Sequence, residues 1–337
     1  MRFIGVDLHQ NSFTVCFLND DESSSLTTFK MSEIASFQHQ LLKTDELAVE
    51  ATGNTRFFVR QVEALVGRVV VVNPSQFEVI TKSTSKTDKA DATALARFLS
   101  KGLLPEARMK DELTAQVASL CQTRDKLVKL RTTLLNKLHG LENGQGRKSA
   151  RESFGSDAGL NRVLKQQWGQ IERVEVEVIV SQVRSLNEGI KRLDEEIKDV
   201  GRKMDGHDNL TSIKGIGDKS ATILLSVIGK VEDFETEDKL ASYFGIVPRV
   251  SNSNETVRHG AITKKGSKLG RTTLVQCSWV AIRYSPYLKS FYEKLKARKG
   301  SGKAIIATAR KLLGIIYRTL KNKWVFADFP NFVLAED

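Results

Sequence analysis

The chain has 337 residues, 40% of them hydrophobic, and a formal net charge of +12. This length favours two or three domains with real cores, and the absence of both a long apolar run and a basic-then-apolar leader predicts a soluble cytoplasmic protein. Three distant cysteines and five histidines without zinc-ligand spacing exclude a disulfide framework and structural zinc, so any metal should have oxygen ligands.

The first hundred residues alternate between β-rich and helical patterns. β-branched and apolar runs predict a hairpin and two further strands, and helical spacing predicts two helices. The predicted strands are 2–7, 13–18, 47–51 and 68–73, and the predicted helices cover 52–66 and 90–100. Strands interleaved with helices indicate an α/β domain over residues 1–106.

The middle region, residues 107–205, is predicted to be helical. Residues 111–139 have an amphipathic pattern, and five glycines among polar residues predict a loop over 140–160. A heptad repeat then follows, with Val176, Val183, Ile190, Ile197 and Met204 at a and with Ile179, Leu186, Leu193 and Val200 at d. This pattern favours a parallel two-stranded coiled coil between protomers, and the alternative is a helix that folds back on residues 111–139.

Residues 206–337 are predicted to be mainly helical and carry most of the positive charge. Between Lys239 and Lys323 there are 19 lysines and arginines against two acids, a balance of +17, which leaves −5 for the remainder. Such a density favours a nucleic-acid partner, because Lys and Arg displace the counterions of phosphates, although a merely soluble basic surface is the alternative.

The segment IKGIGDKSATILLSVIG, residues 213–229, has the pattern of a helix-hairpin-helix. Its Gly-x-Gly turn, Gly215 and Gly217, would let backbone N–H groups at a helix N-terminus approach a phosphate without a Cβ in the way. A plain glycine turn between packed helices is the alternative, and the basic tract that follows favours the phosphate contact.

Four acids occur at positions where an α/β fold brings side chains together. Asp7 ends the first strand and Glu50 lies in the third, while Asp88 and Asp91 share one face of a helix. Four carboxylates so close would repel one another without a cation, and Mg²⁺ suits such ligands and phosphate oxygens. Asp88 and Asp91 alone would indicate a solvated helix face, but the joint order resembles an RNase H-like nuclease core.

Six motifs in this order resemble those of a known family. They are GVD, VEATG, NP, KTDKADA, IKGIGDKSA and FGIVPRVSNSNETVRHG. The chain is similar in them to the DEDD transposases of the insertion sequence 110 family, which includes Piv-type DNA invertases. The resemblance implies a RuvC-like (RNase H-like) domain whose Asp7, Glu50, Asp88 and Asp91 bind Mg²⁺, or Mn²⁺. It also implies a coiled coil that joins protomers into a homodimer or a dimer of dimers.

The same resemblance implies that the C-terminal transposase domain supplies a nucleophilic serine. Ser253 matches the family position, where the neighbour is often glycine but here is Asn254; Ser251 is the other candidate. A serine hydroxyl needs an adjacent base or a metal to become a good nucleophile.

The function that follows is an insertion-sequence transposase, a site-specific DNA recombinase that acts through a phosphoserine–DNA intermediate. By resemblance, a structured noncoding RNA would guide it to donor and target DNA, in a prokaryotic cytoplasm and near the nucleoid. The expected nucleic-acid contacts are Lys214, Gly215, Gly217, Lys219, Arg249, Arg258, Lys264, Lys265, Lys268 and Arg271.

Three other functions are alternatives to this one. A metal-dependent nuclease, such as a junction resolvase, would use water as its nucleophile and form no covalent adduct. A non-catalytic architectural protein would keep its activity when Asp7 and Asp88 are replaced by asparagine. An actin-like ATPase, suggested by GVDLHQN, would need a second glycine-rich phosphate loop that the sequence lacks.

Overall fold

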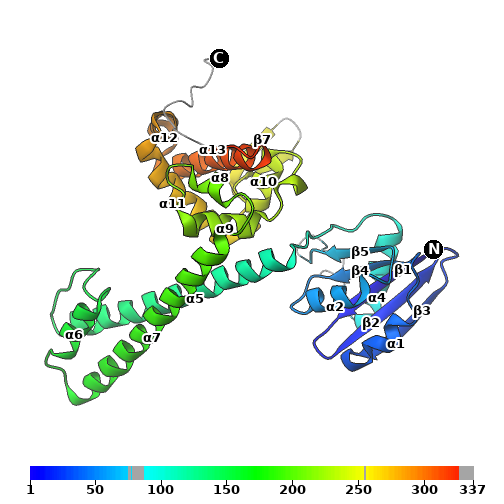
Figure 1. The fold of residues 1–337 in the computed structure, drawn as a ribbon, viewed down its shortest axis with the longest axis horizontal. Helices are drawn as coiled ribbons and strands as arrows, with labels where there is room; N and C mark the ends of the chain where they lie inside the picture. The colour runs from blue at the N-terminus through cyan, green and yellow to red at the C-terminus, as the bar shows by residue number, and fades with distance from the viewer. Residues whose placement is uncertain (75–76, 78–86, 254–255, 326–337) are drawn as a thin grey trace. The chain divides into compact units, whose positions relative to one another are not determined.

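The computed structural model describes residues 1–74, 77, 87–253 and 256–325, and for residues 250–253 and 256–259 it describes the backbone alone. The chain divides into two compact units, Met1–Met109 and Lys110–Asp337 (Figure 1). The first boundary lies close to the predicted end of the α/β domain at residue 106, while the further division at residue 205 stays a prediction. Among the described residues, no helix is long and apolar enough to cross a membrane.

The first unit is built on a mixed five-stranded sheet in the order β3-β2-β1-β4-β5. β1, β2 and β3 are antiparallel neighbours, whereas β1, β4 and β5 run parallel (Figure 1). The strands are β1 (Arg2–Leu8), β2 (Ser12–Asn19), β3 (Ser24–Lys30), β4 (Glu46–Glu50) and β5 (Arg68–Val72). The predicted hairpin and both later strands are confirmed, and the largely exposed edge strand β3 was not predicted.

Helices cover both faces of this sheet. On one face, α1 (Ile34–Gln38) and α2 (Thr55–Val62) enclose a core in which Phe13 contacts three other phenylalanine rings, those of Phe29, Phe37 and Phe58. On the other face, α4 (Asp88–Ser100) packs directly on β1 and β2. The sheet and its covering helices are the mixed α/β arrangement that the sequence predicted.

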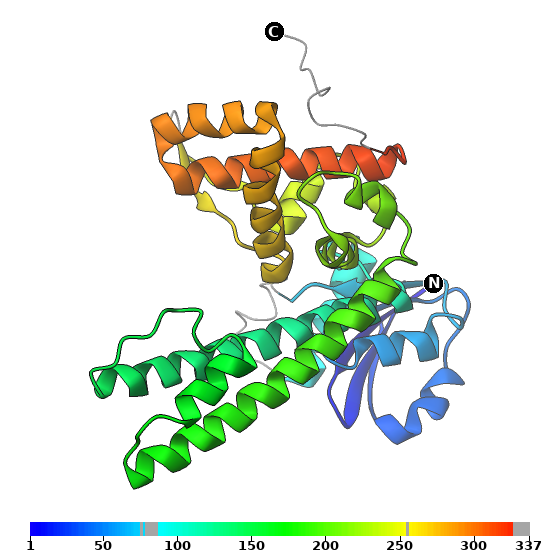
Figure 2. The ribbon, with the colours of Figure 1, turned by 60° about the vertical axis from the view of Figure 1, so that its left-hand side comes forward.

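The second unit begins with two long helices that form a hairpin, α5 (Glu112–Gly144) and α7 (Gln170–Gly201), which run side by side in Figure 2. α6 (Asp157–Leu164) packs on α7. The loop predicted over 140–160 is therefore shorter than expected, because α5 continues to Gly144 and a capped helix begins at Asp157. Ser156 supplies that cap by accepting a hydrogen bond from the Gly159 N–H.

The heptad positions of α7 are used within the chain. Val176, Val183, Ile190 and Ile197 are buried against residues of the same unit, and α5 is the main partner of α7. The Arg124 guanidinium donates to both Asp194 oxygens at 2.9 and 3.1 Å and joins the two helices. This is the fold-back arrangement, so the heptad seam is not free to form the interchain coiled coil we expected from it. A homo-oligomer stays a prediction and would require another surface.

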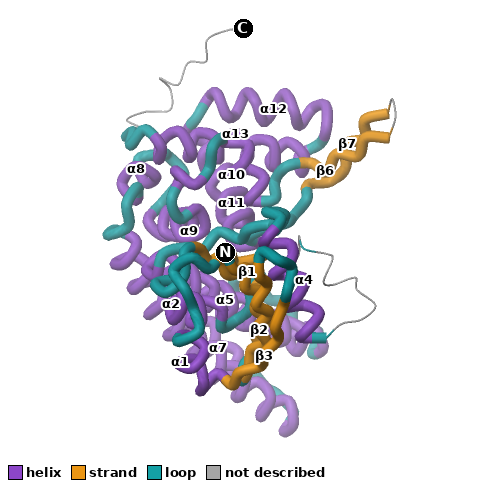
Figure 3. The backbone as a smooth tube through the Cα atoms, turned by 90° about the vertical axis from the view of Figure 1, so that its right-hand side faces the viewer, coloured by secondary structure: helices purple, strands orange, loops and turns teal. Residues whose placement is uncertain are grey.

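The rest of the second unit is mainly helical, as predicted. Its core is formed by α8 (His207–Thr211), α9 (Asp218–Ile228), α10 (Glu237–Phe244), α11 (Lys268–Tyr284), α12 (Pro286–Lys299) and α13 (Ser301–Lys321). Within this region, for which no strand was predicted, residues 248–262 form a hairpin of β6 (Pro248–Ser253) and β7 (Thr256–Ile262) (Figure 3). Alternating Val and Thr with polar residues suits such a two-stranded ribbon.

Candidate functional site

Asp7 lies at the end of β1, on the face of the sheet that α4 covers. Ile4, Val6 and Leu8 point into the core on the opposite face, so the alternation of a strand places Gly5 and Asp7 toward α4. Gly5 allows this contact, because a Cβ there would lie 2.1 Å from the carbonyl oxygen of Ala92. The close approach of helix and strand buries the Asp7 side chain beside the first turn of α4.

The first turn of α4 carries the other two aspartates. Thr87 is the N-cap, and its hydroxyl accepts a hydrogen bond from the Ala90 N–H at 3.2 Å. Asp88 is largely exposed while Asp91 is buried, and residues three apart share one face of a helix. The helix dipole favours carboxylates at this end. The cap therefore fixes the start of the helix that carries both acids, and their role as metal ligands stays a prediction.

His9 completes a cluster that we did not predict from the sequence. Its Nε2 lies 3.3 Å from Asp7 Oδ2 and 3.3 Å from Asp88 Oδ1. In the described part of the chain, Asp7, His9 and Asp88 are the one group of three whose ligand atoms lie within 4.8 Å of one another. The available signal in the sequence was the spacing, since His9 follows Asp7 by two residues, directly after β1 ends.

The pKa of Asp7 is shifted by burial and by the charges of its neighbours in this cluster. Burial raises the pKa of the Asp7 carboxyl above its ordinary value, and the carboxylates of Asp88 and Asp91 add to the rise. His9 acts in the opposite direction and lowers this pKa. A carboxyl with these neighbours is destabilised in its charged form unless a cation is present. The residues present therefore fit a divalent cation.

Glu50 reaches the same edge of the sheet from the neighbouring strand. β1 and β4 are parallel and pair Val6 with Val49, so Asp7 and Glu50 follow each other at the carboxyl ends of adjacent strands. Ala48 packs on the α4 side, and alternation puts Glu50 on that side as well. Thr55 donates from its hydroxyl to the Glu50 carbonyl oxygen at 2.7 Å, which fixes the chain where β4 ends.

The nucleophile predicted in the C-terminal region lies in the β6–β7 hairpin. Ser251 and Ser253 are in β6, where their backbones pair with Arg258 and Thr256. The side chains of both serines and of Arg258 lie outside the described residues. The choice of Ser253 over Ser251 therefore stays a prediction.

The glycine turn between α8 and α9 has two different glycines. Gly215 has a φ of 107°, and a Cβ there would lie 2.8 Å from the Ala281 nitrogen of α11, so its role is packing. Gly217 caps α9, and a Cβ there would meet nothing within 4 Å. Only Gly217 of the pair offers the open helix N-terminus that a phosphate contact requires.

The predicted basic contacts also differ in their surroundings. Lys214, Arg249, Lys264, Lys265 and Lys268 are exposed. These five exposed side chains are the predicted basic residues that a polyanion would contact.

Two other predicted contacts are engaged within the chain. Lys219 Nζ lies 3.5 Å from Asp194 Oδ1, and the Arg271 guanidinium donates to the carbonyl oxygens of Phe244 and Gly266 at 3.1 and 3.0 Å. Burial lowers the pKa of that guanidinium. Arg271 thus joins two backbone segments of the second unit, a role that the sequence did not indicate, whereas Lys219 makes only a half-exposed ion pair.

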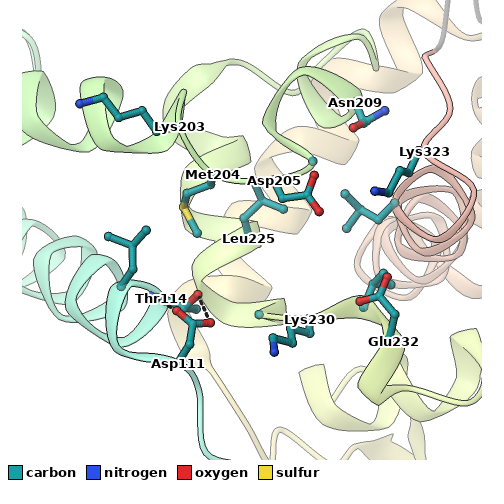
Figure 4. A pocket seen from close by; sticks show the side chains of 15 residues that line it. Asp111, Thr114, Lys203, Met204, Asp205, Asn209, Leu225, Lys230, Glu232 and Lys323 are labelled. Atoms are coloured by element: carbon teal, nitrogen blue, oxygen red, sulfur yellow. Dashed lines mark hydrogen bonds between the residues drawn. The ribbon is translucent and has the colours of Figure 1, made fainter.

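A cavity of about 280 Å³ lies within the second unit, where the start of α5 meets α9 and the end of α13 (Figure 4). Charged groups of both signs line it, namely Asp111, Asp205, Glu232, Lys203, Lys230 and Lys323. Asp111 is already engaged, because it accepts hydrogen bonds from the backbone N–H and the hydroxyl of Thr114. A balanced set of charges does not favour a polyanion, so this cavity is not the predicted nucleic-acid surface.

Two family models match this chain. A model described as transposase, of the DEDD type of IS110 elements, matches residues 4–141 and includes all four predicted acids. A model described as transposase of the IS116/IS110/IS902 family matches residues 207–293 and includes the glycine turn and the β6–β7 hairpin.

Relatives align along nearly the whole chain. The transposase for insertion sequence element IS1111A of Coxiella burnetii is 26% identical, over 95% of this chain and 90% of its own. The transposase for insertion sequence element IS1328 of Yersinia enterocolitica is 24% identical, over 97% and 99%. The pilin gene-inverting protein of Moraxella lacunata is 26% identical, over 96% and 97%.

Proposed function

The chain belongs to the IS110 family of insertion-sequence transposases, and from this premise we propose that it cuts and rejoins DNA by metal-dependent phosphoryl transfer. Asp7, Glu50, Asp88 and Asp91 would hold Mg²⁺ or Mn²⁺, and Ser253 would be the nucleophile. The observation that supports this proposal is the cluster of Asp7, Asp88 and His9, in which His9 Nε2 lies 3.3 Å from a carboxylate oxygen of each aspartate.

The topology supports an RNase H-like identity for the first unit. Three antiparallel strands followed by two parallel ones, in the order β3-β2-β1-β4-β5, put the ends of β1 and β4 side by side. A helix on the same face, α4, then supplies the remaining acids from its first turn. This is the arrangement that an acid-lined phosphodiester site needs, because each carboxylate comes from a rigid element.

The bound cation would supply charge neutralisation at the scissile phosphate and assist ionisation of the nucleophile. The protein's own residues have separate tasks. Asp7, buried on β1, would anchor the site, while the exposed Asp88 would face the entering DNA. Burial and the neighbouring carboxylates raise the pKa of Asp7, so a bound cation would stabilise its charged form.

Strand exchange would take place in two balanced steps. The Ser253 hydroxyl loses its proton and its oxygen attacks phosphorus, forming a phosphoserine bond as the departing DNA strand leaves with a hydroxyl. A DNA hydroxyl then attacks the same phosphorus and displaces serine. The second step restores the enzyme and conserves the energy of the phosphodiester bond.

DNA and a structured guide RNA are the proposed partners of the second unit. The exposed Lys264, Lys265 and Lys268 follow the β6–β7 hairpin directly, so cations lie beside the segment that holds the proposed nucleophile. Their contacts would be to phosphates and would weaken steeply with salt.

A homo-oligomer is also part of the proposal, through a surface other than the heptad. Ile171, Val174 and Val178 form an outer stripe on α7 at helical spacing, with exposed fractions of 86%, 61% and 57%. Single exposed apolar residues are ordinary, but a contiguous stripe is typical of an interface. We assign protomer contact to this outer stripe.

The experiment is to trap the covalent adduct. Purified protein, Mg²⁺ and DNA carrying the element ends are mixed with the copurifying RNA, quenched in denaturant, digested and analysed by mass spectrometry. A phosphoserine–nucleotide at Ser253, lost in Ser253→Ala and retained in Ser251→Ala, is the expected result. A denaturant-resistant adduct in Ser253→Ala would refute the assignment, and cleavage without any adduct would favour a water-using nuclease.

A further inference from the structure

We propose that His9 is a direct ligand of the divalent cation, through Nε2, and that this nitrogen makes the site prefer Mn²⁺ over Mg²⁺. The inference rests on the proposed metal site of Asp7, Glu50, Asp88 and Asp91. It adds a fifth residue, from the turn between β1 and β2.

The spacing of the three atoms supports coordination. His9 Nε2 lies 3.3 Å from Asp7 Oδ2 and 3.3 Å from Asp88 Oδ1, and all three lie within 4.8 Å of one another. Around an octahedral ion with bonds of about 2.1 Å, neighbouring ligands lie about 3.0 Å apart and opposite ligands about 4.2 Å. The cluster thus has nearly the dimensions of a ligand set, and a small contraction would complete it.

The backbone of His9 is held on both sides by hydrogen bonds, which fix the point on the chain from which the imidazole extends. The His9 N–H donates to the Ser12 carbonyl oxygen at 2.9 Å within the hairpin. The His9 carbonyl oxygen accepts from the Asn54 side-chain amide at 2.8 Å. Asn54 belongs to the loop that follows Glu50, so one hydrogen bond joins the two strand ends that carry the acids. Ligands held in this way lose little entropy on binding.

A different role would give the same distances. A protonated His9 could act as a counter-ion that takes the place of a cation between Asp7 and Asp88. A counter-ion must leave when the metal binds, so its removal would tighten metal binding. A ligand has the opposite effect. The two roles therefore predict opposite changes in metal affinity when His9 is replaced.

The chemistry of the donor decides the preferred metal. Mg²⁺ takes oxygen ligands and water, whereas Mn²⁺ accepts imidazole as well as carboxylate. One nitrogen among four carboxylates would therefore favour Mn²⁺ and leave Mg²⁺ as the weaker ion.

The test uses the full chain with Mn²⁺ as the probe. Electron spin-echo modulation of the bound Mn²⁺ is recorded for protein with natural histidine and for protein labelled with ¹⁵N-histidine, and the expected result is a nitrogen coupling that changes with the label. Calorimetric titration with Mn²⁺ and with Mg²⁺ then compares wild type, His9→Gln and, as the control, His39→Gln. His39 is an exposed histidine of the same unit, at the end of α1.

The inference predicts that His9→Gln binds Mn²⁺ at least about tenfold more weakly, loses the coupling and loses most of the preference over Mg²⁺, while His39→Gln behaves as wild type. Asp7→Asn is titrated alongside to show that the bound ion occupies the proposed site. The inference is overturned if Mn²⁺ binding is lost in Asp7→Asn but the wild type shows no ¹⁵N-dependent coupling, or if His9→Gln binds Mn²⁺ more tightly than wild type. If the wild type binds neither ion, or binds in an Asp7-independent manner, the proposed metal site itself fails together with the inference.

Discussion

Replacement of Asp7 by asparagine should stabilise the metal-free protein while removing its activity. Burial and the nearby carboxylates raise the pKa of Asp7. Between the ordinary value of 3.8 and the raised value, the folded state therefore binds more protons than the unfolded state. The stability of the metal-free protein should fall as the pH rises through that window, and the full penalty should persist at neutral pH. The side chain of the Asp7→Asn variant carries no charge, so this substitution should abolish the dependence.

The magnitude follows from the spacing of the cluster. Charges within 4.8 Å, as for Asp7 and Asp88, repel by about 1 kcal/mol in water and about 3 kcal/mol at an effective dielectric constant of 20. His9 offsets part of this repulsion when it is protonated. We therefore expect Asp7→Asn to raise the free energy of opening of the first unit by about 1 kcal/mol in the presence of a chelator.

The assay is native-state hydrogen exchange of the β1 and α4 amides in the full chain, which isolates the first unit. At a Mn²⁺ concentration of about 100 times Kd, wild type should gain about 2.7 kcal/mol and the variant almost nothing. Asp45→Asn is the matched control. Asp45 is fully buried and accepts from Arg2 at 2.7 and 3.0 Å, so this variant should lose about 2–3 kcal/mol.

Two results would refute the reasoning about Asp7. One is a loss of stability in metal-free Asp7→Asn as large as that in Asp45→Asn, which would mean that the Asp7 carboxylate is satisfied without a cation. The other is equal stabilisation of wild type and Asp7→Asn by Mn²⁺.

Three further predictions concern the rest of the fold and site. Glu50→Gln should lower the rate of DNA strand cleavage at least about a hundredfold with unchanged circular dichroism, and a near-normal rate would remove Glu50 from the site. Gly5→Ala should destabilise the first unit by about 3 kcal/mol or more and weaken Mn²⁺ binding, because its Cβ would lie 2.1 Å from the Ala92 carbonyl oxygen; normal exchange of the α4 amides would contradict the close packing. Ile171→Asp combined with Val174→Asp should convert an oligomer to a monomer in analytical ultracentrifugation, and an unchanged sedimentation coefficient would exclude the outer stripe as the interface.

The α/β unit was predictable because its signals are local. A short apolar run predicted β4 and a continuous β-branched run predicted β5. The positions of Asp7 and Glu50 at the ends of their strands were sufficient to predict that both lie at one edge of the sheet. The polar edge strand β3 carries no such pattern, since its residues pair with β2 through the backbone and mostly face solvent. Backbone pairing at an exposed edge leaves little trace in the sequence.

The partner of the heptad could not be read from α7 alone. A stripe of Val, Ile and Leu is buried equally well by a second chain or by α5, and the pattern of one helix is the same in both cases. The bidentate contact of Arg124 with Asp194 decides in favour of α5, but a pair 70 residues apart is visible only in the structure. The strands β6 and β7 were not predicted, because turn-forming residues dominate the composition of this segment.

His9 shows the same limit within the site. The two-residue spacing of His9 from Asp7 does not by itself indicate a ligand, and it becomes significant only when α4 brings Asp88 to 3.3 Å from the His9 Nε2. The acids were identified because the family resemblance and the strand positions agreed. The nucleophile depends on the resemblance alone, which is why Ser253 needs the adduct experiment.

The most direct measurement for the central claim is an anomalous difference map from crystals of the protein grown with Mn²⁺. The proposed site predicts a peak at the edge of the sheet, within about 2.0–2.3 Å of oxygens of Asp7 and of further ligands from Glu50, Asp88 or Asp91. A map with no peak at this edge, or with its only peak elsewhere in the chain, would contradict a metal centre built from these residues.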